Sequence, residues 1–119
     1  MTAPDLQAAA TVVDLAQQVV GKGVRHLSAS GGPDAHQVLA YDLAHAAAAV
    51  ETARSMLGYG ARGEDEARLT CAFVADAVHD LAGRVLGREA LWDLPADSLA
   101  EAVPFLTAYR DPAFLAGSR

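Results

Sequence analysis

Apolar residues recur at three- and four-residue steps along most of this chain, which is the spacing of one face of an α-helix. The first such stripe is Leu6, Ala9, Val13, Ala16 and Val20. Thr2 is placed to cap this helix, and Pro4 is tolerated in its first turn. Gly21 and Gly23 are expected to end it, because glycine readily adopts the left-handed conformation at a helix C-terminus. The pattern predicts a first helix over residues 1–23.

A second stripe follows a loop of small and polar residues. Its apolar positions are Leu39, Leu43, Ala46, Val50, Ala53 and Leu57. Pro33 can open this helix, and Asp34 suits the positive end of the helix dipole. Three glycines in the segment 58–63 mark the turn that follows. We therefore predict a second helix over residues 33–58, whose alanine run leaves room for a neighbouring backbone.

Two apolar lines run along the third predicted helix, over residues 63–87. One line is Leu69, Phe73, Ala77 and Leu81, and the other is Ala75, Val78, Ala82 and Val85. Three acidic residues, 64–66, stand at its start, where the helix dipole favours negative charge. Two lines make a wide buried face, so this helix is expected to be central. If Phe73 lies in the core, its replacement by alanine should cost about 3–5 kcal/mol.

The last predicted helix covers residues 95–110 and should kink at Pro104, which lacks a backbone donor. Trp92 is expected to pack back onto the core just before it, and residues 111–119 should form a tail or linker. No stretch shows the strict alternation of a strand. The sequence predicts one all-α domain over residues 1–119, an up-down antiparallel bundle of about four helices.

Composition and charge narrow the classes of function. The net charge of −6 argues against nucleic acid and against an anionic membrane surface as the main partner. No run of 18 apolar residues and no signal-peptide pattern is present, so a cytoplasmic location is expected. The single cysteine, Cys71, excludes an intrachain disulfide. Its place in a helical pattern favours a buried small side chain over a reactive thiol.

The sharpest local feature is a repeated spacing, Asp42-x-x-His45 and Asp76-x-x-His79. Residues three apart share one face of a helix, so each pair can present a carboxylate and an imidazole together. Carboxylate-x-x-His pairs on two helices are also used by di-iron bundles. Two interpretations follow: a metal site built from these four residues, or ordinary hydrogen bonding on polar faces and between helices. The second interpretation is favoured, since short spacings recur by chance.

Arg84 and Arg88 lie four residues apart near the end of the third predicted helix. Two arginines on one face can receive an acidic partner or another anion. They can equally pair with Asp80 or Glu89 of their own chain. The sequence contains no Gly-rich phosphate loop, no C-x-x-C, no H-E-x-x-H and no G-x-S-x-G. The chain is therefore not expected to be catalytic on its own.

Several stretches of the chain resemble a known accessory segment. These are AYDLAHAAAAVETAR, YGARGEDEARL and GREALW, which fall between His36 and Trp92, and the tail AYRDPAFLA. The run is similar to the N-terminal helical extension of methylsuccinyl-CoA-dehydrogenase-like acyl-CoA dehydrogenases. The core of that family uses FAD and a glutamate base to oxidise an acyl-CoA between its α and β carbons. No part of that core is visible here, so no catalytic or flavin-binding residue is carried over.

The resemblance implies a non-catalytic accessory domain or subunit of a flavin-dependent acyl-CoA dehydrogenase, an oxidoreductase. Its implied role is oligomer assembly or coverage of the acyl-CoA site, and FAD would lie in the partner or in a downstream domain. This hypothesis predicts a large apolar or alanine-lined outer face. The alternatives are a self-associating helical interaction protein unrelated to flavoenzymes and a small metal-binding four-helix bundle.

Overall fold

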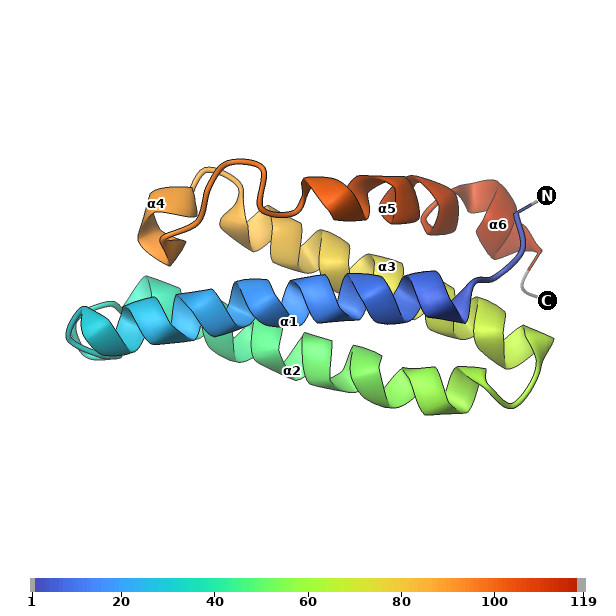
Figure 1. The fold of residues 1–119 in the computed structure, drawn as a ribbon, viewed down its shortest axis with the longest axis horizontal. Helices are drawn as coiled ribbons and strands as arrows, with labels where there is room; N and C mark the ends of the chain where they lie inside the picture. Colours follow the sequence, from blue (N-terminus) through green and yellow to red (C-terminus); the bar gives the residue numbers. More distant parts are fainter. Residues whose placement is uncertain (1, 118–119) are drawn as a thin grey trace.

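The computed structural model describes residues 2–117, and every regular element in that range is helical. This confirms the all-α prediction. The second long helix runs back along the first, and the third runs back along the second (Figure 1). Shorter segments then return along α1 and α3. The elements are α1 (Leu6–Ala29), α2 (Gln37–Gly60), α3 (Glu64–Val85), α4 (Glu89–Trp92), the 3-10 turn η1 (Ala100–Ala102), α5 (Val103–Tyr109) and α6 (Pro112–Ala116).

Helix α1 begins later than predicted, because Asp5 and not Thr2 caps it. The Asp5 carboxylate accepts a hydrogen bond from the backbone N–H of Ala8 at 2.9 Å. That bond satisfies one of the donors left free in a first helical turn. Residues 2–4 therefore precede the helix, and residue 1 lies outside the described residues.

The predicted end of α1 at Gly21 and Gly23 was wrong. The helix continues through both glycines to Ala29. Gly23 is buried, and a Cβ built on it would lie 2.7 Å from the Leu43 side chain and 2.9 Å from the ring of Trp92. This glycine is needed for close packing between elements and does not terminate the helix. The left-handed glycines of this region, Gly31 and Gly32, come in the loop that follows.

Helix α2 begins at Gln37, four residues after the predicted start. Pro33 lies in a turn, where its carbonyl accepts from the N–H of His36 at 3.3 Å. The His36 ring is held against the carbonyl of Ser30 at 2.9 Å, which fixes the entry to the helix. At the other end, the helix continues past Gly58 to Gly60. The alternation of helix and turn was therefore predicted, with shifted boundaries.

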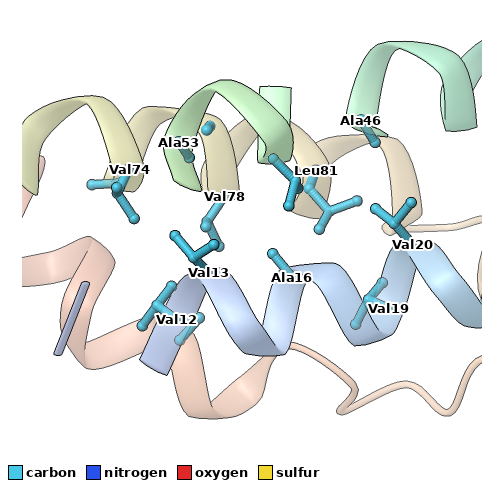
Figure 2. Packing of buried hydrophobic residues seen from close by; sticks show 14 of the residues in the cluster. Val12, Val13, Ala16, Val19, Val20, Ala46, Ala53, Val74, Val78 and Leu81 are labelled. Atoms are coloured by element: carbon cyan, nitrogen blue, oxygen red, sulfur yellow. The ribbon is translucent and has the colours of Figure 1, made fainter. Parts of the chain in front are cut away.

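Small apolar side chains fill the core between the three long helices (Figure 2). The predicted stripe of α1 is buried from Ala9 to Val20, and that of α2 from Leu39 to Ala53. Leu6 and Leu57, at the ends of these stripes, are only partly buried. Labelled in Figure 2 are Val12, Val13, Ala16, Val19, Val20, Ala46, Ala53, Val74, Val78 and Leu81. Alanines beside valines and leucines let these helices approach closely while the core stays filled.

Helix α3 packs against α1, α2 and α5, and its predicted face is buried at Ala75, Ala77, Val78, Leu81 and Val85 but not at its start. Phe73 is 36% exposed and Leu69 is more exposed still. Thr70 and Val74, one position further along each turn, are fully buried instead. The condition for the large cost predicted for Phe73→Ala, burial of this side chain in the core, is therefore not met.

The physical reason is that the polar side chain of Thr70 can be buried, because its hydroxyl is hydrogen-bonded. The hydroxyl of Thr70 donates to the carbonyl of Glu66 in its own helix and lies 3.0 Å from the carbonyl of Met56 in α2. A pattern that counts only apolar side chains places such a threonine on the wrong face. Rotating the helix to bury it turns Leu69 and Phe73 outward.

The single kinked helix predicted over residues 95–110 is also corrected. Residues 95–99 form turns, and the helical part is η1 followed by α5. Pro104 is the second residue of α5, where no intrahelical donor is needed, so it helps to start this helix and does not kink it. Trp92 packs into the core as predicted and is fully buried. The predicted tail contains α6, while residues 118 and 119 lie outside the described residues.

Within residues 2–117, no helix is both long enough and apolar enough to span a membrane.

Candidate functional site

The densest group of charged side chains joins the start of α2 to the end of α3. Asp42 is only 4% exposed, and both of its carboxylate oxygens are bound by arginines. Oδ1 accepts from Arg84 Nη1 at 2.9 Å, and Oδ2 accepts from Arg88 Nη1 at 2.6 Å. Arg84 also donates from Nε to Asp80 at 2.9 Å. We call these four residues the Asp42 cluster.

The charges of the Asp42 cluster cancel. Two arginines face two aspartates, so the cluster carries no formal excess of positive charge. The hydrogen bond to Asp80 raises the pKa of the Arg84 guanidinium; burial opposes this rise, and the hydrogen bond to Asp42 adds to it. Arg84 is therefore held as a cation in a fixed position. The arrangement is suited to locking the two helices together.

Arg88 is the more accessible of the two arginines of the cluster, with half of its side chain exposed. It borders an open surface hollow of about 510 Å³ together with Gln37, Val38 and Tyr41. Tyr41 is exposed, and its ring lies 4.4 Å from the ring of His45, centroid to centroid, at a tilt of 53°. This hollow combines one arginine with an aromatic face, but Asp42 already neutralises the arginine.

The structure does not assemble the four metal-ligand candidates. Asp42 is occupied by two arginines, while His45 is exposed and stacks on Tyr41. Asp76 accepts from Arg110 Nε at 3.1 Å, and His79 is exposed. Among residues 2–117, no group of three or more histidine, cysteine and acidic side chains is arranged to hold a metal ion. Both aspartates are instead hydrogen-bonded to arginines of other segments.

The predicted pairing of the two arginines is confirmed for one of them. Arg84 binds Asp80 as expected, whereas Arg88 binds Asp42 and leaves Glu89 to accept from the backbone N–H of Gly87 at 3.0 Å. Asp42 was missed as their common target. A signal existed, since Asp42 stands three residues after Leu39 and four before Ala46, within the apolar stripe of its helix. A carboxylate at such a position requires a cationic partner when it is buried.

Cys71 is a buried core residue, as the helical pattern predicted. Its thiol is 3.7 Å from the carbonyl of Asp5, to which it donates, and its sulfur accepts from the Asp5 N–H at 3.4 Å. Burial raises the pKa of this thiol, which keeps it protonated and unreactive. The contact holds the start of α1 against α3.

Arg68 was not singled out from the sequence, yet it is buried between α3 and α6. Its Nη2 donates to the carbonyl of Phe114 at 3.1 Å, and its guanidinium lies 4.4 Å from the centre of the Phe114 ring. The residue occurs in a run that reads as a polar helix start, so nothing in the pattern marked it as buried. Its contacts tie the last helix to the core.

Comparison of the chain with protein-family models, with curated proteins and with solved structures finds no match.

Proposed function

We propose that this chain is a non-catalytic helical accessory module of a flavin-dependent acyl-CoA dehydrogenase, serving its assembly or covering part of its acyl-CoA site. The proposal rests on the resemblance of the segments between His36 and Trp92, and on what those segments do in the fold. Asp42, Arg54, Arg68 and Arg88 of these segments are engaged in contacts within the chain. Such residues build a scaffold and leave the surface for binding.

The observation that carries the proposal is the way in which these segments hold one another. Asp42 belongs to the stretch AYDLAH and is bound by Arg88 of GREALW. Arg68 of GEDEARL is bound to Phe114 of the tail AYRDPAFLA, and Arg110 of that tail binds Asp76. The stretches that carry the resemblance thus contribute contacts that hold the helices together, as expected of a structural module.

The outer surface of α2 supports a docking role. Tyr41, Ala44 and Ala48 are exposed at helical spacing on one face, and Leu69 and Phe73 are exposed on the neighbouring helix α3. An accessory module is expected to have such an alanine-lined outer face, because small side chains allow close approach of a partner helix. The face fits a protein partner better than a soluble substrate, because Arg88, the cation that borders the hollow beside Tyr41, is already bound by Asp42.

Native mass spectrometry of the chain purified gently from its own cells tests this proposal. A complex with a larger subunit that carries FAD, or the chain found as the head of a longer flavoprotein, is the expected result. The double variant Ala44→Glu, Ala48→Glu should weaken that complex. The control Ala90→Glu, Ala96→Glu adds the same charge at exposed alanines elsewhere and should leave it intact.

A bare 12.3 kDa chain or its dimer, without a flavin partner, would contradict the accessory role. A dimer that dissociates in the Ala44→Glu, Ala48→Glu variant would instead favour the self-associating alternative, which uses the same face.

A further inference from the structure

A groove runs along the flank of α1 that faces η1 and α5. It consists of two adjoining hollows with accessible volumes of about 190 and 470 Å³. Both hollows are lined by Thr11, Val12 and Glu101, which makes them continuous. Its floor is mainly apolar, and it is separate from the Asp42 cluster.

The groove exists because the fourth part of the fold is short. Residues 95–99 form turns, so helical structure begins only at Ala100 and ends at Tyr109. A segment of this length covers α1 incompletely, whereas α2 and α3 cover their own sides of α1 along most of its length (Figure 1). Ala8 and Leu15 of α1 are left only partly buried as a result.

The spacing of the groove residues on α1 indicates the shape of an occupant. Ala8, Thr11, Leu15 and Gln18 follow the steps of a second stripe on this helix, beside the core residue Val12, which also lines the groove. The stripe covers roughly 15 Å at about 1.5 Å per residue, which is about three helical turns. Small residues on the opposite wall, Pro104 and Ala108, leave space for a helix to lie in the groove.

Charge indicates which kind of helix fits. Glu101 lies where the two hollows meet, is exposed, and forms no ion pair with any lysine or arginine among residues 2–117. Asp14, at the other end of the groove, is already bound by Arg54 at 2.6 Å. The groove therefore presents one available carboxylate above an apolar floor, which is complementary to a basic amphipathic helix.

We propose that this groove binds an amphipathic helix of a partner protein, about three turns long, with small apolar side chains on one face and a lysine or arginine opposite Glu101. The expectation that the partner belongs to a flavoprotein rests on the proposed function. The type of helix that fits the groove is argued from the groove alone. The α2 face and this groove lie on different sides of the bundle, so one module can contact two elements of an assembly.

Isothermal titration calorimetry with a defined probe tests the groove. The probe is a synthetic, end-capped 14-residue peptide with leucine and alanine on one helical face and lysine on the other. A scrambled peptide of the same composition measures non-specific attraction to an acidic protein. We expect the amphipathic peptide to bind at least tenfold more tightly than the scrambled one, and a version with glutamate in place of lysine to bind at least tenfold more weakly.

Two variants, each with a matched control, test whether the peptide binds in the groove. Glu101→Lys should weaken binding at least tenfold, whereas Glu51→Lys makes the same change on exposed α2 and should not. Thr11→Tyr should fill the groove and block binding. Thr52→Tyr is its control, because Thr11 and Thr52 are both exposed and both donate to the carbonyl four residues earlier, at 3.1 and 2.9 Å.

Equal affinity of the amphipathic and scrambled peptides, or unchanged affinity in Glu101→Lys and Thr11→Tyr, would overturn the proposal. Sedimentation velocity of the chain alone covers the other occupant. If wild type self-associates and Thr11→Tyr abolishes this, the groove holds a second copy and the partner-helix proposal fails. If the wild-type chain does not bind the peptide but does form the flavoprotein complex, the groove proposal alone fails. If it binds the peptide but forms no flavoprotein complex, only the accessory role fails.

Discussion

The interface between α2 and α3 and the interface between α3 and the C-terminal segments are both held by charged side chains, but under different conditions. Between α2 and α3, Asp42 is buried and bound by two arginines. Between α3 and α5, Asp76 is 72% exposed and bound by Arg110 alone. The first interface joins two long helices, and the second joins a long helix to a short one. Ion pairs of similar length should therefore contribute very different free energies.

The difference shows that burial of the charged side chains distinguishes the interface between the long helices from the interface with the C-terminal segments. The long helices bury continuous stripes, while the segments after Val85 bury single large residues such as Trp92, Phe105 and Phe114. The groove proposed to bind a partner helix lies beside the second kind of region. Substitutions can sharpen or break this comparison, beginning with the largest expected effect.

The inner and outer faces of α3 should differ most. Leu81 is almost fully buried, so Leu81→Ala should lower the free energy of unfolding by about 2–5 kcal/mol. Phe73→Ala removes a larger but partly exposed side chain and should cost less than about 1 kcal/mol. Urea unfolding followed by circular dichroism measures both values. Similar losses in the two variants would show that the assignment of buried and exposed faces of α3 is wrong.

The two interfaces can be compared directly with one kind of substitution. Asp42→Asn keeps the shape of the side chain but removes the charge that faces Arg84 and Arg88, and it should cost about 1–3 kcal/mol. Asp76→Asn makes the same change in the exposed pair with Arg110 and should cost at most about 1 kcal/mol. Both are read from urea midpoints at the same ionic strength. If Asp76→Asn lowered the free energy of unfolding more than Asp42→Asn did, burial would not determine how much each ion pair contributes to stability.

Burial also explains which parts of the fold could be predicted from the sequence. The long helices and most of their buried stripes were predictable, because their apolar residues repeat with the helical period. The buried face at the start of α3 was not, since Thr70 is buried through hydrogen bonds that a count of apolar residues ignores. Gly23 was wrongly predicted to end the first helix for a related reason. Its role depends on Leu43 and Trp92, which are distant in sequence.

The charged residues follow the same rule. The spacing of Asp42 and His45 indicated a shared face, but a residue three positions away is not the partner that burial selects. Asp42 meets Arg84 and Arg88 because α2 and α3 are antiparallel, which brings the start of one helix to the end of the other. The division of the predicted helix over residues 95–110 into turns, η1 and α5 was not predictable either, since short segments there depend on tertiary packing more than on their own periodicity.

A smaller effect is expected from the buried thiol of Cys71. Burial raises its pKa above the ordinary value of 9.0, so the unfolded chain releases this proton at a lower pH than the folded protein. The thiol therefore favours the folded state below pH 9 relative to more alkaline solution, and stability should fall as the pH rises above that value. Urea unfolding between pH 8 and about 10.5 measures the slope, which should be shallower in Cys71→Ala.

Tyr109 is a second buried group that should contribute to the loss of stability at alkaline pH. Burial also raises the pKa of its hydroxyl, which donates to the carbonyl of Ala3 at 2.8 Å. Cys71→Ala should therefore retain part of the alkaline loss, and Cys71→Ala combined with Tyr109→Phe should retain less. Slopes identical to wild type in both variants would contradict the link between burial of these groups and stability.

The smallest effect is expected where the sequence showed its most regular spacing. His45→Gln combined with His79→Gln removes the imidazole of each Asp-x-x-His pair from an exposed position. We expect stability within about 0.5 kcal/mol of wild type and the same content of zinc and iron per chain, measured by plasma mass spectrometry after dialysis. The aspartates of both pairs are already bound by arginines, so the histidines alone offer too few ligands to hold a metal. Metal that copurifies with wild type at a fixed ratio and disappears in the double variant would establish the metal-binding alternative, and would require the Asp42 cluster to open in the metal-bound state.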